Sequence, residues 1–455
     1  MAKYQKYAEY KDSGLEWLGE IPSHWKIASL RFLVEAVSNG STASQVEEYE
    51  TTVPISRIES ISTGEIDMNK VGFVDIKTIS QNFKLHKNDI LLSHINSLPM
   101  VGNIALKRDD STLFHGMNLL RLVPNRTITA PYYLFWLLKS IYFRKSVESV
   151  AKPAINQASV SIDSLKNIKL LVPNIDEQIA IANFLDHETS KIDHLIEKQQ
   201  QLIELLKEKR QAVISHAVTK GLNPNVSMKD SGVEWLGQVP EHWIITCLAR
   251  ISGIKRGSGY QNIEMDVAER ETIQMLRIAD MHEIAPALIV KNNEVIRYLV
   301  EEGDILVAGT GATAGISMLV PKECHGWVHS YNSIKVKVDP KKVNSSFLQL
   351  FLTSDYIKKS LDVSFVGSAQ PFVDTNGLGR LRVLLPPLHE QIYIFDYLNI
   401  QTKKIDLLIS KAQSQINFMQ ERRTALISAA VTGKIDVRNW QNPNNNNEAK
   451  TEFSA

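Results

Sequence analysis

The sequence of 455 residues contains few cysteines, since Cys247 and Cys324 are its only two. One pair of thiols cannot build a cysteine-rich zinc site, and such scarcity favours a reducing compartment over a secreted, disulfide-bonded protein. The sequence also lacks any apolar run near the ~18 residues typical of a membrane-spanning helix, and its first residues lack the apolar segment of a signal peptide. These absences predict a cytoplasmic protein that does not cross a membrane.

An excess of charge of either sign is also missing, because 51 basic side chains are set against 50 acidic ones, for a formal net charge of +1. A near-neutral total gives no global reason to expect nucleic acid, but a basic groove can be balanced by acidic surface elsewhere. The apolar fraction of 44% is that of an ordinary globular protein with hydrophobic cores. At about 100–200 residues for each domain, the length predicts roughly two to four domains.

Motifs of catalysis and cofactor binding are absent as well. The chain has no P-loop sequence GxxxxGK(S/T), no HExxH, no Asn-Pro-Pro-Tyr or Asp-Pro-Pro-Tyr methyltransferase motif, and no convincing cluster of nuclease carboxylates. The stretch GTGATAG at residues 309–315 lies between two strand-like runs, whereas a dinucleotide site needs a helix after its glycines. We therefore expect a loop between strands there, and a chain that is not an enzyme and binds no metal or cofactor itself.

What the sequence does contain is an internal repeat. KDSGLEWLGEIPSHW at residues 11–25 returns as KDSGVEWLGQVPEHW at residues 229–243, with 11 of 15 positions identical. Its glycine and proline steps are typical of turns, and its tryptophans of apolar anchors. His24 and His242 lack a cysteine, serine or second histidine at a catalytic spacing. We expect each copy to be a packed linker that seats a domain against a helix end, with the anchors Trp17, Trp25, Trp235 and Trp243.

A second, longer block starts at Leu171 and again at Leu384, with a constant offset of 213 residues and no gap. Residues 175–219 hold no proline or glycine, which predicts a helix about 65 Å long at about 1.5 Å per residue. The repeat pairs equivalent positions of the two copies: Glu177 with Glu390, Gln178 with Gln391, Asp193 with Asp406, and Arg210 with Arg423.

Apolar residues in both long helices recur with the alternating three-and-four spacing of a coiled coil. The same phase in both copies indicates that the helices pack on each other, most simply antiparallel about a pseudo-twofold axis. The alternative is two unrelated amphipathic helices, each packed on its own domain. The expected seam consists of Leu185, Ile192, Ile196, Ile203 and Leu206 in the first helix and Leu398, Ile405, Ile409, Ile416 and Met419 in the second.

Between the repeated blocks lie two variable segments, residues 26–170 and 244–383, that share little sequence similarity. Strand-like and helix-like runs follow in the same order in both, so we expect two globular domains of mixed α+β fold. The expected division is a first globular domain with its Trp motif at 1–170, a long helix at 171–221, a second globular domain at 222–383, a second long helix at 384–435, and a tail at 436–455 that is disordered after Gln441.

Polar and basic residues in the variable segments are candidates for contact with DNA. KRGSGYQ combines cations, glycines, a tyrosine and a glutamine, a set suited to phosphate contact and base-edge hydrogen bonding, although such loops are also ordinary solvated turns. Scattered cations, among them Arg121 and Lys335, are more often solvated surface charges. The candidate contacts are Lys255, Arg256, Ser258, Tyr260 and Gln261 from this loop, Lys152, Asn156 and Gln157 from KPAINQAS, Gln370 from GSAQPF, and Arg277.

With its two Trp motifs and the pattern P…EQ…LD…KID…R…LIS..VTG in both copies, the chain resembles the specificity subunit of type I restriction–modification systems over nearly its whole length. The resemblance implies two domains that each read one half of a split, asymmetric DNA target. It also implies helices that act as a spacer and dock two methyltransferase subunits, with restriction/translocase subunits as further partners. S-adenosylmethionine, ATP and magnesium would be bound by those partners.

The residues by themselves support the same interpretation. Two unlike domains joined by long helices can read two unlike half-sites, for which a separation near one turn of the duplex, about 34–36 Å, is common. Two alternatives remain at this point. One is a fragment of a single-chain restriction–modification enzyme, and the other is a coiled-coil scaffold protein without DNA specificity.

Overall fold

The computed structural model describes residues 4–15, 18–97, 100–154, 157–234, 236–265, 270–281, 284–364 and 372–443. The chain divides into two compact units, which are described separately below. Unit 1 comprises Met1–Gln199 and Ser414–Ala455, and unit 2 comprises Gln200–Gln413. Both boundaries fall within long helices, so each unit holds part of α5 (Ile175–Lys220) and part of α9 (Leu388–Val431).

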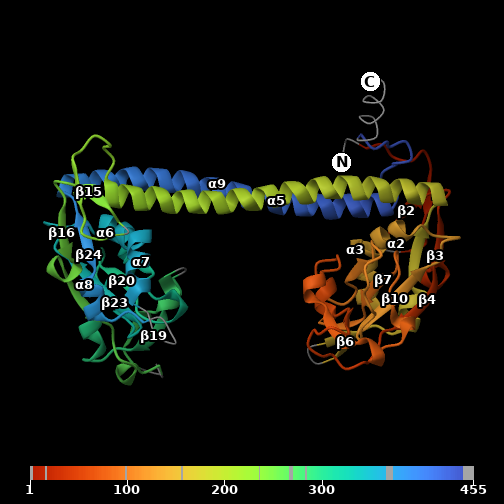
Figure 1. The fold of residues 1–455 in the computed structure, drawn as a ribbon, viewed down its shortest axis with the longest axis horizontal. Coiled ribbons are helices and arrows are strands. Elements are labelled where there is room, and N and C mark those ends of the chain that lie inside the picture. Colours follow the sequence, from red (N-terminus) through yellow and green to blue (C-terminus); the bar gives the residue numbers. More distant parts are fainter. Residues whose placement is uncertain are drawn as a thin grey trace. The chain divides into compact units, whose positions relative to one another are not determined.

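Unit 1 is built on an antiparallel sheet between the long helices and a group of loops (Figure 1). The sheet has four strands in the order β4 (Val34–Asn39), β10 (Leu119–Pro124), β7 (Ile90–Ser93) and β9 (Ile104–Leu106). The Trp motif forms the hairpin β1 (Tyr10–Asp12) and β2 (Glu20–Pro22), and β3 (Lys26–Ser29) pairs with β13 (Lys169–Val172) just before α5. The short helices of the unit are α1 (Leu30–Leu33), α2 (Pro131–Leu138), α3 (Ile141–Val150) and α4 (Ile162–Asn167).

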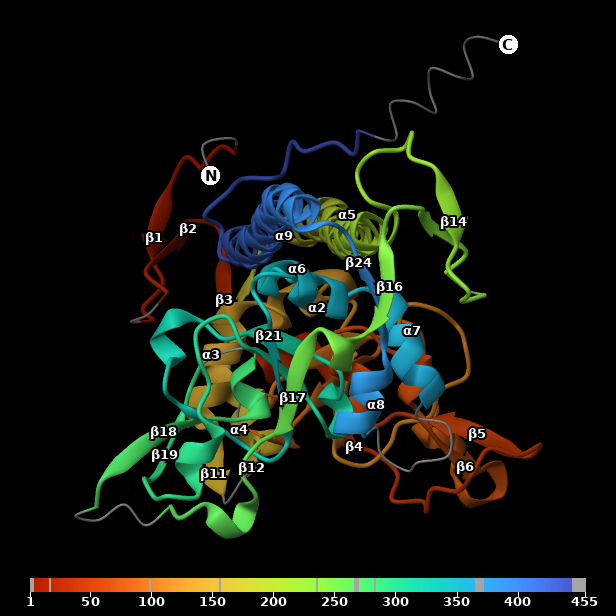
Figure 2. The same ribbon diagram turned by 90° about the vertical axis from the view of Figure 1, so that its left-hand side faces the viewer.

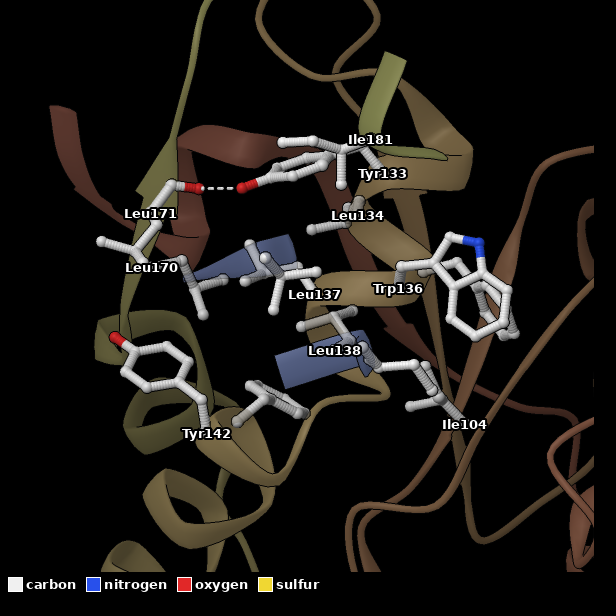
Figure 3. Packing of buried hydrophobic residues seen from close by; sticks show 14 of the residues in the cluster. Ile104, Tyr133, Leu134, Trp136, Leu137, Leu138, Tyr142, Leu170, Leu171 and Ile181 are labelled. Carbon is white, nitrogen blue, oxygen red and sulfur yellow. Dashed lines mark hydrogen bonds between the residues drawn. The ribbon is translucent and has the colours of Figure 1, made fainter. Parts of the chain in front are cut away.

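Helix α2 links the sheet of unit 1 to α5. Pro131 opens this helix, where its fixed φ suits the first turn, and the following residues are almost all apolar and buried. Tyr133 Oη donates to Leu171 O at 2.9 Å, as Figure 3 shows, and Trp136 Nε1 donates to Asp186 Oδ1 at 2.9 Å. The core of unit 1 therefore continues from the sheet through α2 into the long helices.

Unit 2 repeats the central sheet of this plan and the elements that flank the long helices (Figure 2). Its sheet has the order β17 (Ser252–Arg256), β23 (Ser333–Val338), β20 (Ile305–Ala308) and β21 (Ser317–Leu319). The registers correspond, because Leu122 pairs with Ile90 in unit 1 and Val336 with Ile305 in unit 2. The remaining equivalents are β14 (Met228–Asp230), β15 (Gln238–Pro240), β16 (Ile244–Cys247) paired with β24 (Arg382–Leu385), α6 (Ser345–Leu352), α7 (Asp355–Ser364) and α8 (Thr375–Arg380).

The two units differ in the elements added to the common sheet. Unit 1 has the hairpin β5 (Thr52–Ile55) and β6 (Gly72–Asp75), and a small sheet of β11 (Lys152–Ala154), β12 (Gln157–Ser159) and β8 (Ile95–Asn96). Unit 2 instead has a small sheet of β19 (Ala287–Val290), β18 (Thr272–Leu276) and β22 (Val328–His329). The expected mixed α+β fold of two domains is thus confirmed.

The long helices pack on each other within each unit, and they run antiparallel. In unit 1, Arg423 of α9 donates to Asp193 of α5 through Nε and Nη2, at 2.7 and 3.1 Å. In unit 2, Arg210 donates to Asp406 in the same way, at 2.9 and 3.4 Å. All ten expected seam residues are buried or half-buried. The alternative in which each helix packs only on its own domain is therefore wrong.

The segment after α9 returns to the Trp motif of unit 1. Lys434 Nζ donates to Glu20 O at 2.8 Å, and Tyr10 Oη donates to Gly433 O at 3.0 Å. Most of the tail expected to be disordered, residues 444–455, lies outside the described residues. Of the helices that the structure describes, none combines the length and the apolar composition needed to span a membrane.

Candidate nucleic-acid interface

Strand β17 ends at Arg256, and the next residues turn closely against the segment that leads into β23. Ser258 N donates to His329 O at 3.0 Å, and Ser258 and Ser330 form a parallel bridge. A Cβ atom on Gly257 would lie 2.1 Å from Ser330 O, so only glycine fits this approach. Arg256, Gly309, Tyr331 and Phe372 come together here and form the unit 2 corner.

The guanidinium of Arg256 is fixed inside the unit 2 corner. Its Nη2 donates to Val373 O at 2.7 Å, and its Nη1 donates to Tyr331 O at 3.3 Å. It also lies over the rings of Tyr331 and Phe372, 5.2 and 4.9 Å from their centroids. A Cβ atom on Gly309 would come within 3.0 Å of Arg256 Nη1. The first glycine of GTGATAG therefore makes room for the guanidinium, and its loop joins the antiparallel strands β20 and β21, as expected.

Three aromatic rings are exposed here, two of them in the unit 2 corner and the third, Tyr260, beside it. Tyr260, Tyr331 and Phe372 have 63%, 41% and 48% of their surface exposed. The rings of Tyr260 and Tyr331 lie 6.0 Å apart at 48°, and Asn332 Nδ2 donates to Tyr260 Oη. Large apolar side chains at such exposure are suited to contact with another molecule when they cluster, whereas single ones are common on any surface.

Unit 1 has the same backbone arrangement at the equivalent place. Ser41 N donates to His115 O at 2.8 Å, and a Cβ atom on Gly40 would lie 2.0 Å from Gly116 O. At the other side of the corner, Val160 N donates to His94 O at 2.9 Å, as Val373 N donates to Gly309 O at 2.8 Å in unit 2. The unit 1 corner consists of the equivalent residues: Asn39 for Arg256, His94 for Gly309, Met117 for Tyr331 and Ser159 for Phe372.

The side chains on this shared backbone differ in chemistry. Asn39 and Ser159 are exposed polar groups, and Met117 is 54% exposed. Burial lowers the pKa of His94, so its imidazole is neutral near pH 7. The unit 1 corner therefore offers amide, hydroxyl and thioether groups, where unit 2 offers aromatic rings around an arginine.

A buried histidine binds the backbone of each corner through its own carbonyl. His115 Nε2 lies 3.0 Å from Leu119 O, and His329 Nδ1 lies 3.1 Å from Ser333 Oγ. Burial lowers the pKa of His115 to about 4 and the pKa of His329 to about 3, so both imidazoles are neutral near pH 7. Their backbone carbonyls hold Ser41 and Ser258, which makes these histidines part of the backbone arrangement rather than candidate acids or bases.

Other candidate residues from the sequence are spread over the two units. Lys255 Nζ donates to Arg297 O at 2.8 Å and lies 4.6 Å from the Tyr298 ring centroid. Arg277 is bound to Asp280 at 3.2 Å and to Ala285 O at 2.6 Å. Ser258 is buried, whereas Gln261, Lys152 and Gln157 are exposed. Asn156, Gln370, Trp17 and Trp235 lie outside the described residues.

Two cations considered as phosphate contacts are instead held in ion pairs inside the sheets. Arg121 Nη2 lies 2.7 Å from Asp89 Oδ2, and Lys335 Nζ lies 3.6 Å from Asp304 Oδ2, with all four side chains mostly buried. The two pairs occupy equivalent places, next to the turn that opens β7 or β20. Because each cation faces a carboxylate within the fold, removing either partner would leave the other charge buried and unpaired.

The sequence did not identify four of the corner residues as candidate contacts: Tyr331, Phe372, Asn39 and Met117. A signal for two of them exists, because FHGMN at residues 114–118 and VHSYN at residues 328–332 share a His-x-x-Asn pattern in corresponding places. The third residue of each pattern, Met117 or Tyr331, is an exposed residue of the corner. Aligning the two halves on this pattern would have found it.

Each Trp motif is joined to the start of a long helix by one carboxylate. Glu177 accepts from Trp25 Nε1 at 2.9 Å and lies 2.9 Å from His24 Nε2. Glu390 does the same for Trp243 and His242, at 3.2 and 2.8 Å. Both indole rings are fully buried. The histidines that the sequence analysis set aside as non-catalytic thus bind the first turn of a helix.

The glutamine that follows each of these glutamates binds the chain just before α2 or α6. Gln178 Oε1 accepts from Ala130 N at 2.8 Å, and Gln391 Oε1 accepts from Asn344 N at 2.8 Å. Their Nε2 groups donate to Pro173 O at 2.9 Å and Pro386 O at 2.8 Å. The repeated Glu-Gln pair therefore fixes each long helix both to its Trp motif and to its globular domain.

No group of three or more His, Cys, Asp or Glu side chains suited to a metal ion occurs in the part of the chain that the structure describes. Comparison with known proteins identifies the class of protein. A family model described as the type I restriction modification DNA specificity domain matches residues 22–205 and, a second time, residues 240–417.

Individual relatives agree with this match. A chain of Methanocaldococcus jannaschii, named as the MjaX specificity subunit of a type I restriction enzyme, is 31% identical over 426 residues, which cover 92% of this chain and 96% of the relative. The EcoKI specificity subunit of Escherichia coli K12 is 22% identical over 449 residues, 94% of this chain and 92% of the relative. This chain belongs to the family of type I restriction–modification specificity subunits.

Solved structures share the fold. A chain from a study of complex assembly in the type I R-M system superposes with a TM-score of 0.71 at 14% identity, covering 91% of this chain and 99% of the other. The HsdS subunit from Thermoanaerobacter tengcongensis gives a TM-score of 0.53 at 14% identity, over 91% of this chain and 98% of the other.

Proposed function

We propose that this chain reads a bipartite, asymmetric DNA target through two recognition domains, residues 1–170 and 222–383. The observation that carries the proposal is one backbone arrangement, present twice, with unlike exposed side chains at its two corners. The family model likewise matches once in each half. Equal surfaces would favour a symmetric target, whereas unlike surfaces favour two different half-sites.

The long helices, residues 171–221 and 384–435, are proposed to set the spacing between the half-sites. Support comes from the bidentate Arg–Asp pair that each unit places across its two helices, since such pairs specify register between packed helices. Inserting one helical turn after Gln199 and another at its mate Ala412 should change the tolerated spacer length. A change in the half-site sequences instead would contradict the spacer role.

The partners are proposed to be two methyltransferase subunits and further restriction/translocase subunits, which would bind S-adenosylmethionine, ATP and magnesium in the cytoplasm. Apolar side chains outside the seam support docking on the long helices, because they are exposed along both of them. On α5 these include Leu195, Leu202 and Leu205, and on α9 they include Leu407, Leu408 and Phe418. In this proposal residues 436–455 form a C-terminal tail that lies outside the two spacer helices.

The alternatives are separated by one transfer assay and one binding assay. Labelled S-adenosylmethionine is incubated with DNA and the purified chain, alone and with methyltransferase subunits of its own system; transfer only with the subunits is expected. Transfer by the chain alone would favour a single-chain enzyme fragment and overturn the proposal. A gel-shift series with varied salt tests the scaffold alternative, for which no DNA preference should appear at any ionic strength.

A further inference from the structure

The arginine of the unit 2 corner is the obvious candidate for reading a guanine, but its contacts argue otherwise. A guanine is read by two N–H groups of an arginine that can align with O6 and N7. One N–H of each terminal nitrogen of Arg256 already donates to a backbone carbonyl, of Tyr331 or Val373, and these bonds fix the direction of the remaining N–H groups. The guanidinium is also confined between the Tyr331 and Phe372 rings. Reaching a base edge would require breaking these contacts together.

The contacts of Arg256 place two aromatic rings at the surface instead. The guanidinium covers one face of each ring, while 41% of Tyr331 and 48% of Phe372 stay exposed. The Tyr260 ring lies 6.0 Å from the Tyr331 ring, tilted by 48°, and extends this surface. The tilted Tyr260–Tyr331 pair leaves no slot between parallel rings for a stacked base, and the guanidinium of Arg256 lies over both Tyr331 and Phe372. What remains is a set of ring edges and outer faces, which suits apolar contact with a small group.

The small apolar group that DNA presents in its major groove is the 5-methyl of thymine. We propose that Tyr331 and Phe372 are specificity-determining residues of the second recognition domain, which contact a thymine methyl, and that Arg256 is a positioning residue that holds both rings. This inference rests on the proposed function, since it assigns a base contact to a domain proposed to read one half-site. Glycine at position 309 is part of the arrangement, because any Cβ there would displace the guanidinium.

The test uses the full chain assembled with the methyltransferase subunits of its own system. Duplexes carry the target sequence, found by methylome sequencing, with each thymine of the half-site read by residues 222–383 replaced in turn by uracil. Loss of one buried methyl, at ~0.8 kcal/mol, should weaken binding about fourfold at one or two of these positions. Tyr331→Ala or Phe372→Ala should bind the thymine and uracil duplexes equally at such a position.

Arg256→Lys should also lose this thymine preference, because a lysine ammonium cannot donate to both carbonyls while lying flat against two rings. Leu288→Ala is the matched control, since Leu288 is an exposed apolar residue of the same unit on β19, outside the corner. This control should keep the fourfold preference. Circular dichroism melts of all variants show whether a lost preference reflects unfolding.

The outcomes separate the inference from the proposed function. A wild-type complex without any sequence preference would overturn both. A wild-type complex that prefers its target but binds thymine and uracil alike at every position of this half-site would overturn the inference alone. The same holds if Tyr331→Ala and Phe372→Ala keep the full preference, or if Arg256→Lys does.

Discussion

The corners of the two recognition units differ in their exposed side chains and agree in what lies beneath them. Arg256, Tyr331 and Phe372 of unit 2 stand where unit 1 has Asn39, Met117 and Ser159. The supporting features recur: a glycine too close to a carbonyl for any side chain, and a buried neutral histidine. Backbone hydrogen bonds set the shape of each corner, so its surface residues are free to differ. This separation allows one fold to serve two recognition tasks.

The strands added to the common sheet also differ between the units, whereas the attachment to the long helices does not. Unit 1 adds β5–β6 and β11–β12–β8, whereas unit 2 adds β19–β18–β22. Within each unit, β6 or β19 lies at the end of the domain away from the long helices (Figures 1 and 2). The attachment to the long helices, by contrast, is the same in both units, down to the atoms of the Glu-Gln pair. The common part serves attachment, and in the proposed function the variable part serves recognition.

The largest effect is expected where the attachment itself is broken. Trp25→Ala removes a fully buried ring and its hydrogen bond to Glu177, which should cost about 3–5 kcal/mol of folding free energy. Hydrogen exchange followed by mass spectrometry should show lost protection in unit 1, with unit 2 unchanged. Trp243→Ala is the matched variant and should give the reverse pattern. Equal loss in both units after either change would show that their stabilities are not separable.

Acid should weaken both units through their buried histidines. The folded pKa values, about 4 for His115 and about 3 for His329, lie below the ~6.5 of an unfolded histidine. Each neutral imidazole therefore contributes stability that is fully present above pH ~6.5 and is lost as pH falls toward the folded value. Between pH 7.5 and 5.0 the loss is on the order of 2 kcal/mol for each histidine.

Denaturant unfolding at the two pH values measures this loss. His329→Asn keeps a polar atom near Ser333 Oγ but cannot be protonated, so it should remove the acid sensitivity of unit 2 alone. His115→Gln, which keeps a polar atom near Leu119 O, is the counterpart in unit 1. An undiminished pH dependence in both variants would assign the effect to other groups.

A smaller effect should come from added methyl groups at the corners. Gly309→Ala brings a Cβ within 3.0 Å of Arg256 and should cost about 1–3 kcal/mol as overpacking. Because unit 1 already has His94 at this place, only the half-site read by unit 2 should lose selectivity. Binding to duplexes mutated in one half-site at a time measures this. Equal loss for both half-sites would contradict independent corners.

The smallest effect is expected for the ion pairs between the long helices. Arg210 and Asp406 are partly exposed, so Arg210→Ala should lower stability by about 0.2–1 kcal/mol, as surface pairs do. Arg423 is less exposed, and Arg423→Ala should cost somewhat more. Double-mutant cycles with Asp406→Ala and Asp193→Ala measure each coupling. A coupling indistinguishable from zero in both cycles would remove their role in helix register.

Much of this architecture follows from the sequence. The repeat, the helix from Ile175 and the seam spacing are local or periodic features, which sequence patterns report well. The repeated Glu, Gln, Asp and Arg positions were visible too, but not their partners, because Glu177 meets Trp25 across 152 residues. Long-range contacts of this kind depend on how strands and helices are brought together.

The candidate interface shows more clearly what the sequence alone could not predict. The sequence offered Arg256 as a contact for phosphates or base edges, but the structure surrounds it with carbonyls and rings supplied by two other segments, at Tyr331 and at Phe372–Val373. Arg121 and Lys335 look like surface cations, yet each faces a buried carboxylate. Charge alone does not tell whether a side chain faces solvent or the fold. Of the exposed aromatic side chains, Tyr260 was a candidate from the sequence, whereas Tyr331 and Phe372 emerged only from the structure.

Methylome sequencing of cells that carry either the wild-type chain or a chimera tests the central claim most directly. In the chimera, residues 244–383 are replaced by the equivalent segment of another specificity subunit, with both long helices kept. The account predicts that one half of the methylated sequence changes, while the other half and the spacer between them stay the same. Altered bases in both halves, or an unchanged target, would contradict it.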